Sequence, residues 1–173
     1  MLAVVVLGLS TFGCEPATSK FEYKEKRILT GLQPYGIAFH EGSIHISSPD
    51  ENLIAVLNDE YLPASMINDY EGPRRLNTTA EQLIIAEFET NRIVLRKGNQ
   101  SFYYPLVQKL NGPMACDMVK SVLTVADYNA HRIVFFEGSE DKSFGDQGSG
   151  EKEFHYPTDV QIHGQKIYVA DNA

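Results

Sequence analysis

The stretch "DYNAHRIVFF" (127–136) contains a pattern that recurs elsewhere in the chain. It matches "FETNRIVLRK" (88–97) and, more faintly, "DENLIAVLND" (50–59). In each segment an Asn or His stands directly before an Arg or Leu, and an apolar run rich in β-branched residues follows. Repetition at nearly fixed spacing indicates that one small structural unit is used several times.

A proline opens each unit, and these prolines give the period. They are Pro34 in "PYGIAF", Pro73 in "PRRLNT", Pro113 in "PMACDM" and Pro157 in "PTDVQI", which lie 39, 40 and 44 residues apart. Each hexapeptide predicts a first strand. Second strands are predicted at 43–48, 82–87, 122–127 and 166–171, and third strands at 52–57, 91–96 and 131–136. Fourth strands are predicted at 65–70, at 101–106 and near Lys142–Phe144.

The period of about 40 residues, with only strand-type segments inside it, excludes helical repeats of similar length. Those repeats need amphipathic windows of about 11–18 residues, and the sequence contains none. Turns rich in Gly, Asn, Asp and Pro separate the strands. Short strands repeated in this way, four to a unit, are typical of the blades of a β-propeller. The sequence therefore predicts an all-β chain built from blades.

The C-terminal part of the chain also resembles a known repeat family. The segment "FGDQGSGEKEFHYPTDVQIHGQKIYVADNA" (144–173), preceded by "VADYNAHRIVFF" (125–136), is similar to the NHL repeat. That pattern runs from a Gly-rich loop through Phe and Pro to an apolar strand, then to a "YVAD" strand and "N-x-R-I". The matching residues are Phe154, Pro157, Tyr168, Val169, Ala170, Asp171, Asp127, Arg132 and Ile133.

The resemblance implies an NHL-type β-propeller over residues 28–173. It is strongest in the last two units and weakest in the first, where "SSPDENLIAV" (47–56) lacks both the Asp and the Arg. NHL propellers typically have about six blades, so three blades and part of a fourth imply a fragment of a longer protein. The alternatives are a crescent that closes by dimerisation and a ring with fewer blades. The repeats are then about 34–72, 73–112, 113–156 and 157–173.

Polar residues recur at fixed positions of the unit, which favours a structural role because a catalytic residue is normally needed once. Asp and Asn side chains bond nearby backbone amides in turns, and an Arg pairs with an acidic side chain of its own or the next blade. No catalytic residue is assigned. The acidic column is Glu87, Asp127 and Asp171, the turn column is Asn52, Asn91 and His131, and the basic column is Arg92 and Arg132.

The first 14 residues, "MLAVVVLGLSTFGC", are typical of a signal peptide, because the apolar run is too short to span a bilayer as a helix. Its end resembles a bacterial lipoprotein signal, which implies that Cys14 is lipidated, although Phe12 and the missing basic start depart from that pattern. The alternatives are an ordinary cleaved signal in which Cys14 has no role and, less favoured because nothing polar alternates with the apolar run, a buried strand. We therefore expect an exported protein, either anchored in the membrane and facing the periplasm or secreted. Residues 15–27 are expected to form a tether, and 21–29 to supply a possible closing strand of the propeller.

The composition and the motifs limit the classes of partner and cofactor that we expect for this protein. The net charge of −8 argues against a nucleic-acid surface, which needs clustered Lys and Arg. Membrane contact is expected only through the lipid anchor. No motif of a nucleophile, metal or phosphate site is present, so no metal site or cofactor is assigned. His40 and His45 flank a predicted hairpin turn, and this favours a solvated turn over a metal site. Cys116 is interpreted as a small buried hydrophobe.

The two positions after each repeat proline differ from blade to blade, as expected of a specific binding face. They are Tyr35 and Gly36, Arg74 and Arg75, Met114 and Ala115, and Thr158 and Asp159. Because they lead into the innermost strand, we expect them at the mouth of the central channel. The candidate binding residues are Arg74, Arg75, Thr158 and Asp159, of which Arg75 and Asp159 are expected to line an anion- or peptide-binding mouth. The alternative is that these are ordinary solvated charges.

Two functions remain open from the sequence. The first is an exported binding or scaffold module for a protein, peptide or glycan ligand. The second is a metal-dependent lyase or lactonase with its site in the central channel, since some propellers of this type are such enzymes. The second would need His, Asp, Glu or Asn from several blades to converge on a divalent metal. RNA binding, as in some NHL proteins, conflicts with the expected export and the acidity.

Overall fold

The structure is a computed structural model that describes residues 3–10, 20–29 and 31–172. It divides into two units, residues 1–33 and 34–173. In the first unit, β1 (Ala3–Ser10) pairs antiparallel with β2 (Lys20–Ile28). The strand expected at 21–29 is thus present and has β1 as its partner, while its role in closing a blade stays a prediction. Cys14 and most of the expected tether lie outside the described residues. None of the helices in the described ranges is long and apolar enough to cross a membrane.

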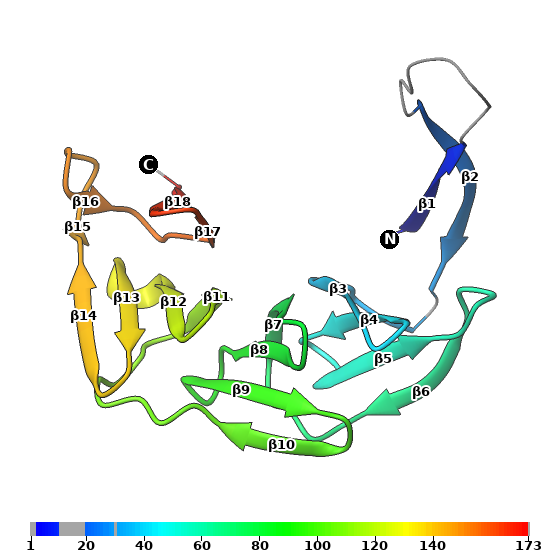
Figure 1. Ribbon diagram of the computed structural model, residues 1–173, viewed down its shortest axis with the longest axis horizontal. Helices are drawn as coiled ribbons and strands as arrows, with labels where there is room; N and C mark the ends of the chain where they lie inside the picture. Colours follow the sequence, from blue (N-terminus) through cyan, green and yellow to red (C-terminus); the bar gives the residue numbers. More distant parts are fainter. Residues whose placement is uncertain (1–2, 11–19, 30, 173) are drawn as a thin grey trace. The chain divides into compact units, whose positions relative to one another are not determined.

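The second unit is made almost entirely of antiparallel strands, and each large sheet follows the order of the chain (Figure 1). The first sheet contains β3 (Ile37–His40), β4 (Ser43–Ser48), β5 (Leu53–Leu57) and β6 (Pro63–Ile67). The second contains β7 (Pro73–Thr78), β8 (Leu83–Glu87), β9 (Arg92–Lys97) and β10 (Gln100–Tyr103). The third contains β11 (Pro113–Val119), β12 (Val122–Asp127), β13 (Arg132–Glu137) and β14 (Glu140–Phe144).

Shorter elements complete the unit. The only helix among the described residues is the single 3₁₀ turn η1 (Tyr128–Ala130), between β12 and β13. After the third sheet, β15 (Asp146–Gln147) pairs in parallel with β16 (Glu153–Phe154). A fourth sheet follows as the antiparallel pair β17 (Asp159–His163) and β18 (Lys166–Ala170). The expectation of an all-β chain with four strands to a unit is therefore confirmed for the described part of the chain.

Neighbouring sheets meet through their first strands. Strand β7 contacts β3 on one side and β11 on the other, and β11 also contacts β17. In Figure 1 these first strands lie along the inner side of the unit, while β6, β10 and β14 lie along its outer side. Each first strand is therefore positioned to present side chains to one shared inner region, as in a propeller.

The core lies between the sheets, and β8 explains how one strand serves two interfaces. Successive side chains of a strand point to opposite faces. Leu83 and Ile85 pack toward the first sheet, and Ile84 and Ala86 pack toward the third, all with no exposed surface. A sheet covered on both faces needs continuous apolar strands, which is why β8 contains an unbroken apolar run before Glu87. Cys116 belongs to the same core and is buried, as expected.

Candidate functional site

The acidic residues that end the second strands are bound within their own sheet. Glu87 is only 1 % exposed, and its carboxylate accepts hydrogen bonds from the Thr90 hydroxyl at 2.6 Å and from the Glu71 amide at 3.3 Å. The Arg92 guanidinium forms an ion pair with it at 2.8 Å. The Glu87 charge is therefore matched by Arg92 and is not available to a ligand.

Asp127 repeats this arrangement in the third sheet. Its carboxylate, with no exposed surface, accepts from the Asn111 amide at 2.6 Å and from Arg132 at 2.8 Å. Burial raises the pKa of Asp127, and the bonds to Asn111 and Arg132 partly oppose that rise. In the fourth sheet the Asp171 carboxylate accepts from the His155 amide at 2.8 Å. The acid thus fixes the loop that leads into the first strand of its own sheet.

The turn residues fix the same loop from the preceding sheet. They adopt left-handed backbone conformations, with φ between 53° and 57°, which Asn tolerates better than most residues. Each side chain accepts a hydrogen bond from a backbone amide of the next unit. That amide belongs to the residue directly after the one whose amide is bound by the acidic side chain. The pairs are Asn52 with Gly72 at 2.7 Å, Asn91 with Gly112 at 2.6 Å, and His131 with Tyr156 at 3.3 Å. The recurring polar residues therefore hold successive sheets together.

The blade-variable positions lie where two of the first strands are irregular. Strand β7 shifts register between Pro73 and Leu76, and β11 shifts between Pro113 and Ala115. Such bulges bend a strand and redirect its side chains, and they are common at the rims of barrels and next to active sites. The bulges contain three of the positions singled out in the sequence, Arg74, Arg75 and Met114.

Arg74 is held by aromatic rings. Its guanidinium carbon lies 5.1 Å from the ring centre of Tyr35 and 4.8 Å from that of Phe88, both within range of a cation–π interaction. The Tyr35 hydroxyl reaches across to donate to the sulfur of Met114 at 3.0 Å. Tyr35, Arg74 and Met114, which are variable positions of three different units, thus form one cluster of contacts that Arg74 stabilises.

Arg75 and Asp159 come together as the centre of a polar cavity. The Arg75 guanidinium lies 3.2 Å from the Asp159 carboxylate, and the two side chains are 45 % and 30 % exposed. The cavity has a volume of about 230 Å³, and Asn77 and Gln161 add amide groups to its lining. We call this the inner-strand pocket, since its polar side chains come from β7 and β17. It offers donors and acceptors that water can reach.

Asp117 forms the buried support of the inner-strand pocket. It is 8 % exposed, accepts from the Asn77 amide group at 2.8 Å, and accepts from the Ile162 backbone amide at 2.6 Å. These bonds join β7, β11 and β17, and they fix the orientation of Asn77. Thr158, in contrast, donates its hydroxyl to the Ala170 carbonyl of its own sheet.

Sequence reasoning missed Asn77, Asp117 and Gln161, although the signal was present. Each stands two residues after the second variable position of its unit. Because side chains two apart point to the same face of a strand, these residues extend the variable face along the first strands. Their polar character at this shared position of the unit could have identified them.

The histidine pair corrects one expectation. His40 and His45 do not lie on a solvated turn, because they are 6 % and 8 % exposed and their ring centres are 5.9 Å apart. They are buried at the side of the first sheet, within a cavity that also contains Arg96. Among the residues that the structure describes, no group of three or more His, Cys, Asp or Glu side chains is arranged to hold a metal ion.

Solved structures with the same fold are β-propellers. A streptogramin B lyase matches at 18 % identity with a TM-score of 0.65, over 80 % of this chain and 48 % of that one. An inactive virginiamycin B lyase from Staphylococcus aureus with quinupristin matches at 14 % identity and a TM-score of 0.64, over 99 % and 54 %. An auxiliary nutrient binding protein from Bacteroides ovatus matches at 14 % identity and a TM-score of 0.59, over 79 % and 45 %.

These likenesses establish the fold alone. The chain spans about half the length of these three structures. No protein-family model matches the sequence, and neither does any curated protein. The combination of four-stranded antiparallel sheets and these neighbours identifies the chain as having a β-propeller fold.

Proposed function

We propose that this chain is a binding module of the NHL type, in which the inner-strand pocket recognises a protein, peptide or glycan ligand. The observation that carries the proposal is that recurring and variable polar residues have different contacts. The polar side chains that recur from one unit to another are used in bonds between and within sheets. The polar side chains that differ between units instead surround one cavity.

The chemistry of the pocket suits a polar, uncharged ligand group. Arg75 and Asp159 neutralise each other, so a ligand with a full charge would have to break their ion pair. Both side chains are partly exposed and keep unused donor and acceptor capacity. Together with the amides of Asn77 and Gln161 they match the paired donors and acceptors of a peptide group or a sugar diol.

A binding screen with matched variants tests this proposal. The wild-type chain is screened on a glycan array and a peptide array, and each ligand bound is measured again with the Arg75→Ala/Asp159→Ala double variant. We expect at least about a tenfold loss of affinity. The control is Lys142→Ala/Glu140→Ala, which removes an exposed ion pair of the outer strand β14. Unchanged affinity in the Arg75/Asp159 variant contradicts the proposal.

The second candidate is a metal-dependent propeller enzyme of the lyase or lactonase type. It is supported by the lyases among the structural neighbours, which share only the fold. In this chain Asp159 lines the inner-strand pocket and Asp117 supports it, and both carboxylates are already bonded. Elemental analysis of the purified protein separates the two functions, since a stoichiometric divalent ion would favour the enzyme.

We also propose that the protein is exported and anchored through a lipid on Cys14, with no direct nucleic-acid or membrane partner. The composition of residues 1–14 supports this proposal. Incorporation of labelled palmitate by a bacterial host, and its loss in Cys14→Ser, tests lipidation. Labelling that persists in Cys14→Ser contradicts it.

A further inference from the structure

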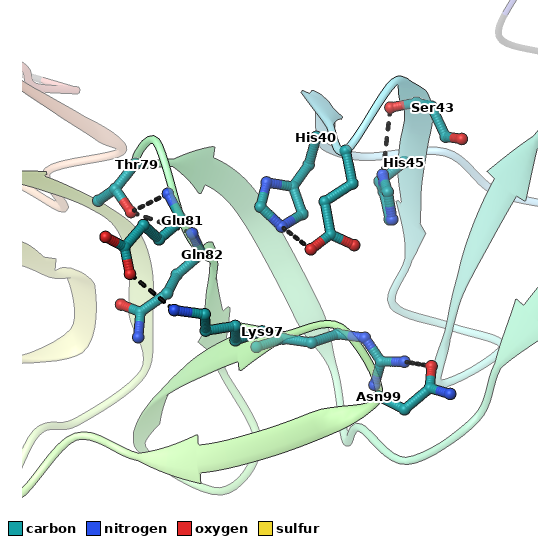
Figure 2. Close-up of polar contacts among 10 residues, drawn as sticks. His40, Ser43, His45, Thr79, Glu81, Gln82, Lys97 and Asn99 are labelled. Carbon is teal, nitrogen blue, oxygen red and sulfur yellow. Dashed lines mark hydrogen bonds and ion pairs between the residues drawn. The ribbon is translucent and has the colours of Figure 1, made fainter.

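A second cavity lies beside the histidine pair, between the first and second sheets. Its volume is about 220 Å³, and its polar lining comes from the hairpin of β3 and β4, from β6, and from the end of β9 with the turn that follows it. Figure 2 shows His40, Ser43 and His45 on that hairpin and Asn99 on the turn. We call it the histidine cavity. It shares no lining residue with the inner-strand pocket.

One side chain of the histidine cavity is buried without a hydrogen bond. The Nε2 atom of His40 has no hydrogen-bond partner among the described residues. The nearest acid, Glu41, lies 3.8 Å from it, which is ion-pair distance for a protonated His40 but too long for a hydrogen bond. Buried polar atoms in folded proteins are nearly always bonded, so the position of His40 indicates a missing partner.

Arg96 faces the same cavity and is also incompletely bonded. Within the described part of the chain, its guanidinium donates only to neutral oxygens, those of Tyr70 at 3.4 Å and Asn99 at 3.5 Å. No carboxylate of the described residues pairs with Arg96, whereas Arg92 and Arg132 each form an ion pair at 2.8 Å. An Arg in this state presents several free donors in a fork that suits a group with two or more oxygens.

The charges around the cavity favour an anion. Burial lowers the pKa of His45, and the charges of His40 and Arg96 lower it further. The hydrogen bond to the Ser43 carbonyl and the charge of Glu41 raise this pKa and partly oppose the decrease. The Arg96 charge would repel a metal cation, and it would attract a negative group. The ionisable groups that line the cavity are His40 of β3, Glu41 of the turn, His45 of β4 and Arg96 of β9, while β5 and β6 contribute Val56, Ser65 and Ile67.

We propose that the histidine cavity binds a single oxyanion group, of the sulfate, phosphate or carboxylate class, between Arg96 and His40. The cavity is smaller than the roughly 300–1,000 Å³ of pockets for drug-sized ligands, which suits one such group. The oxyanion would accept from the guanidinium and from a protonated His40. Glu41, exposed on the adjacent turn and close to His40, would compete with it.

Sulfate and acetate titrations test this proposal without reference to the inner-strand pocket. The imidazole and amide NMR signals of the full chain are followed as each salt replaces sodium chloride at constant ionic strength. Sulfate keeps one charge state over the pH range used, and so any pH dependence belongs to the protein. We expect saturable shifts at His40 and His45 with at least one of the two anions, and tighter binding at lower pH, because a protonated imidazole donates from both of its nitrogens.

Three variants sharpen the test. Arg96→Gln and His40→Gln should each weaken anion binding at least tenfold, and Glu41→Gln should strengthen it because the competing carboxylate is gone. The matched control is Lys97→Gln, which removes the same charge from the adjacent residue. Lys97 points to Glu81 at 2.7 Å (Figure 2) and is not among the residues that line the cavity, so its loss should change the affinity less than twofold.

The outcomes that overturn the proposal are distinct. One is an absence of saturable shifts with both anions. Another is an equal effect of Arg96→Gln and Lys97→Gln, which would assign the binding to net charge alone. A third is a Glu41→Gln variant that binds no more tightly than wild type. If Arg96→Gln fails to fold, His40→Gln and Glu41→Gln still decide the matter.

Discussion

Two variants of Asp127 separate the stability that its hydrogen bonds provide from the stability that its charge provides. Asp127→Ala removes the acceptor of the Asn111 amide and the partner of Arg132, while Asp127→Asn keeps a carbonyl oxygen for the amide. Removing one member of a buried ion pair costs roughly 3–5 kcal/mol. Because the Arg132 side chain is 24 % exposed and can regain water, we expect about 3 kcal/mol for the Ala variant.

The Asn variant should be milder. It loses a charge-assisted hydrogen bond worth about 1.5–3 kcal/mol, but it no longer buries a charge. We expect a net loss of about 1 kcal/mol, since burial is the main cause of the raised pKa of Asp127. Urea unfolding followed by circular dichroism gives both free energies of unfolding. An Asn variant as unstable as the Ala variant would refute the reasoning.

The pH dependence of the same pair gives an independent check. Asp127 has a pKa raised above its ordinary value of 3.8. Its contribution to stability is therefore greatest below the pKa of the unfolded chain and is lost as the pH rises through the folded pKa. Wild type should gain stability relative to Asp127→Asn as the pH falls toward 3.8. A difference that shrinks instead would mean that the Arg132 interaction dominates.

Three further predictions concern the turns and the core. Asn91→Ala should lower the free energy of unfolding by about 2 kcal/mol, because it leaves the Gly112 amide unbonded and places Ala in a backbone conformation with φ 57°. Asn91→Gly loses the same hydrogen bond without the backbone strain and should cost about 1 kcal/mol. Urea unfolding distinguishes the two variants, and equal losses would contradict the contribution of backbone strain. Gly112→Ala should cost more than about 2 kcal/mol, since its Cβ would overlap the Asn129 side-chain amide and lie 2.8 Å from the Phe88 ring. Gly98→Ala, whose Cβ meets nothing within 4 Å, should cost about 1 kcal/mol, and similar unfolding midpoints of the two variants would refute this. Burial raises the pKa of the Cys116 thiol, so in a Cys14→Ser background a thiol reagent should modify it only after unfolding, and rapid labelling of the folded chain would contradict this.

Local sequence patterns predicted the strands well because the bounds of a strand depend mainly on residues that are close in sequence. The second strands at 43–48 and 122–127 and the first strand at 73–78 have the bounds expected. Pro, Gly and Asn fix the turns, and a fully covered strand must be apolar. The fourth strands end earlier than expected, at Ile67 and Tyr103, because few contacts hold the outer edge of a sheet and the sequence there is least constrained.

The candidate site was only partly predictable because it depends on contacts between sheets. The variable positions were visible in the sequence, but the pairing of Arg75 with Asp159 spans 84 residues of chain, since 159 − 75 = 84. The aromatic contacts of Arg74 could not be deduced either, because they require the bulge in β7. The burial of His40 and His45 was mispredicted, since the neighbouring sheet that covers them is distant in sequence.

The central claim, that ligands bind where the first strands face the channel, is tested most directly by mapping a bound ligand. The amide NMR spectrum of the chain is recorded with increasing amounts of the tightest ligand from the arrays. The account predicts shifts at the amides of β7, β11 and β17 around Arg75 and Asp159. Shifts confined to the outer strands β6, β10 and β14 would contradict it.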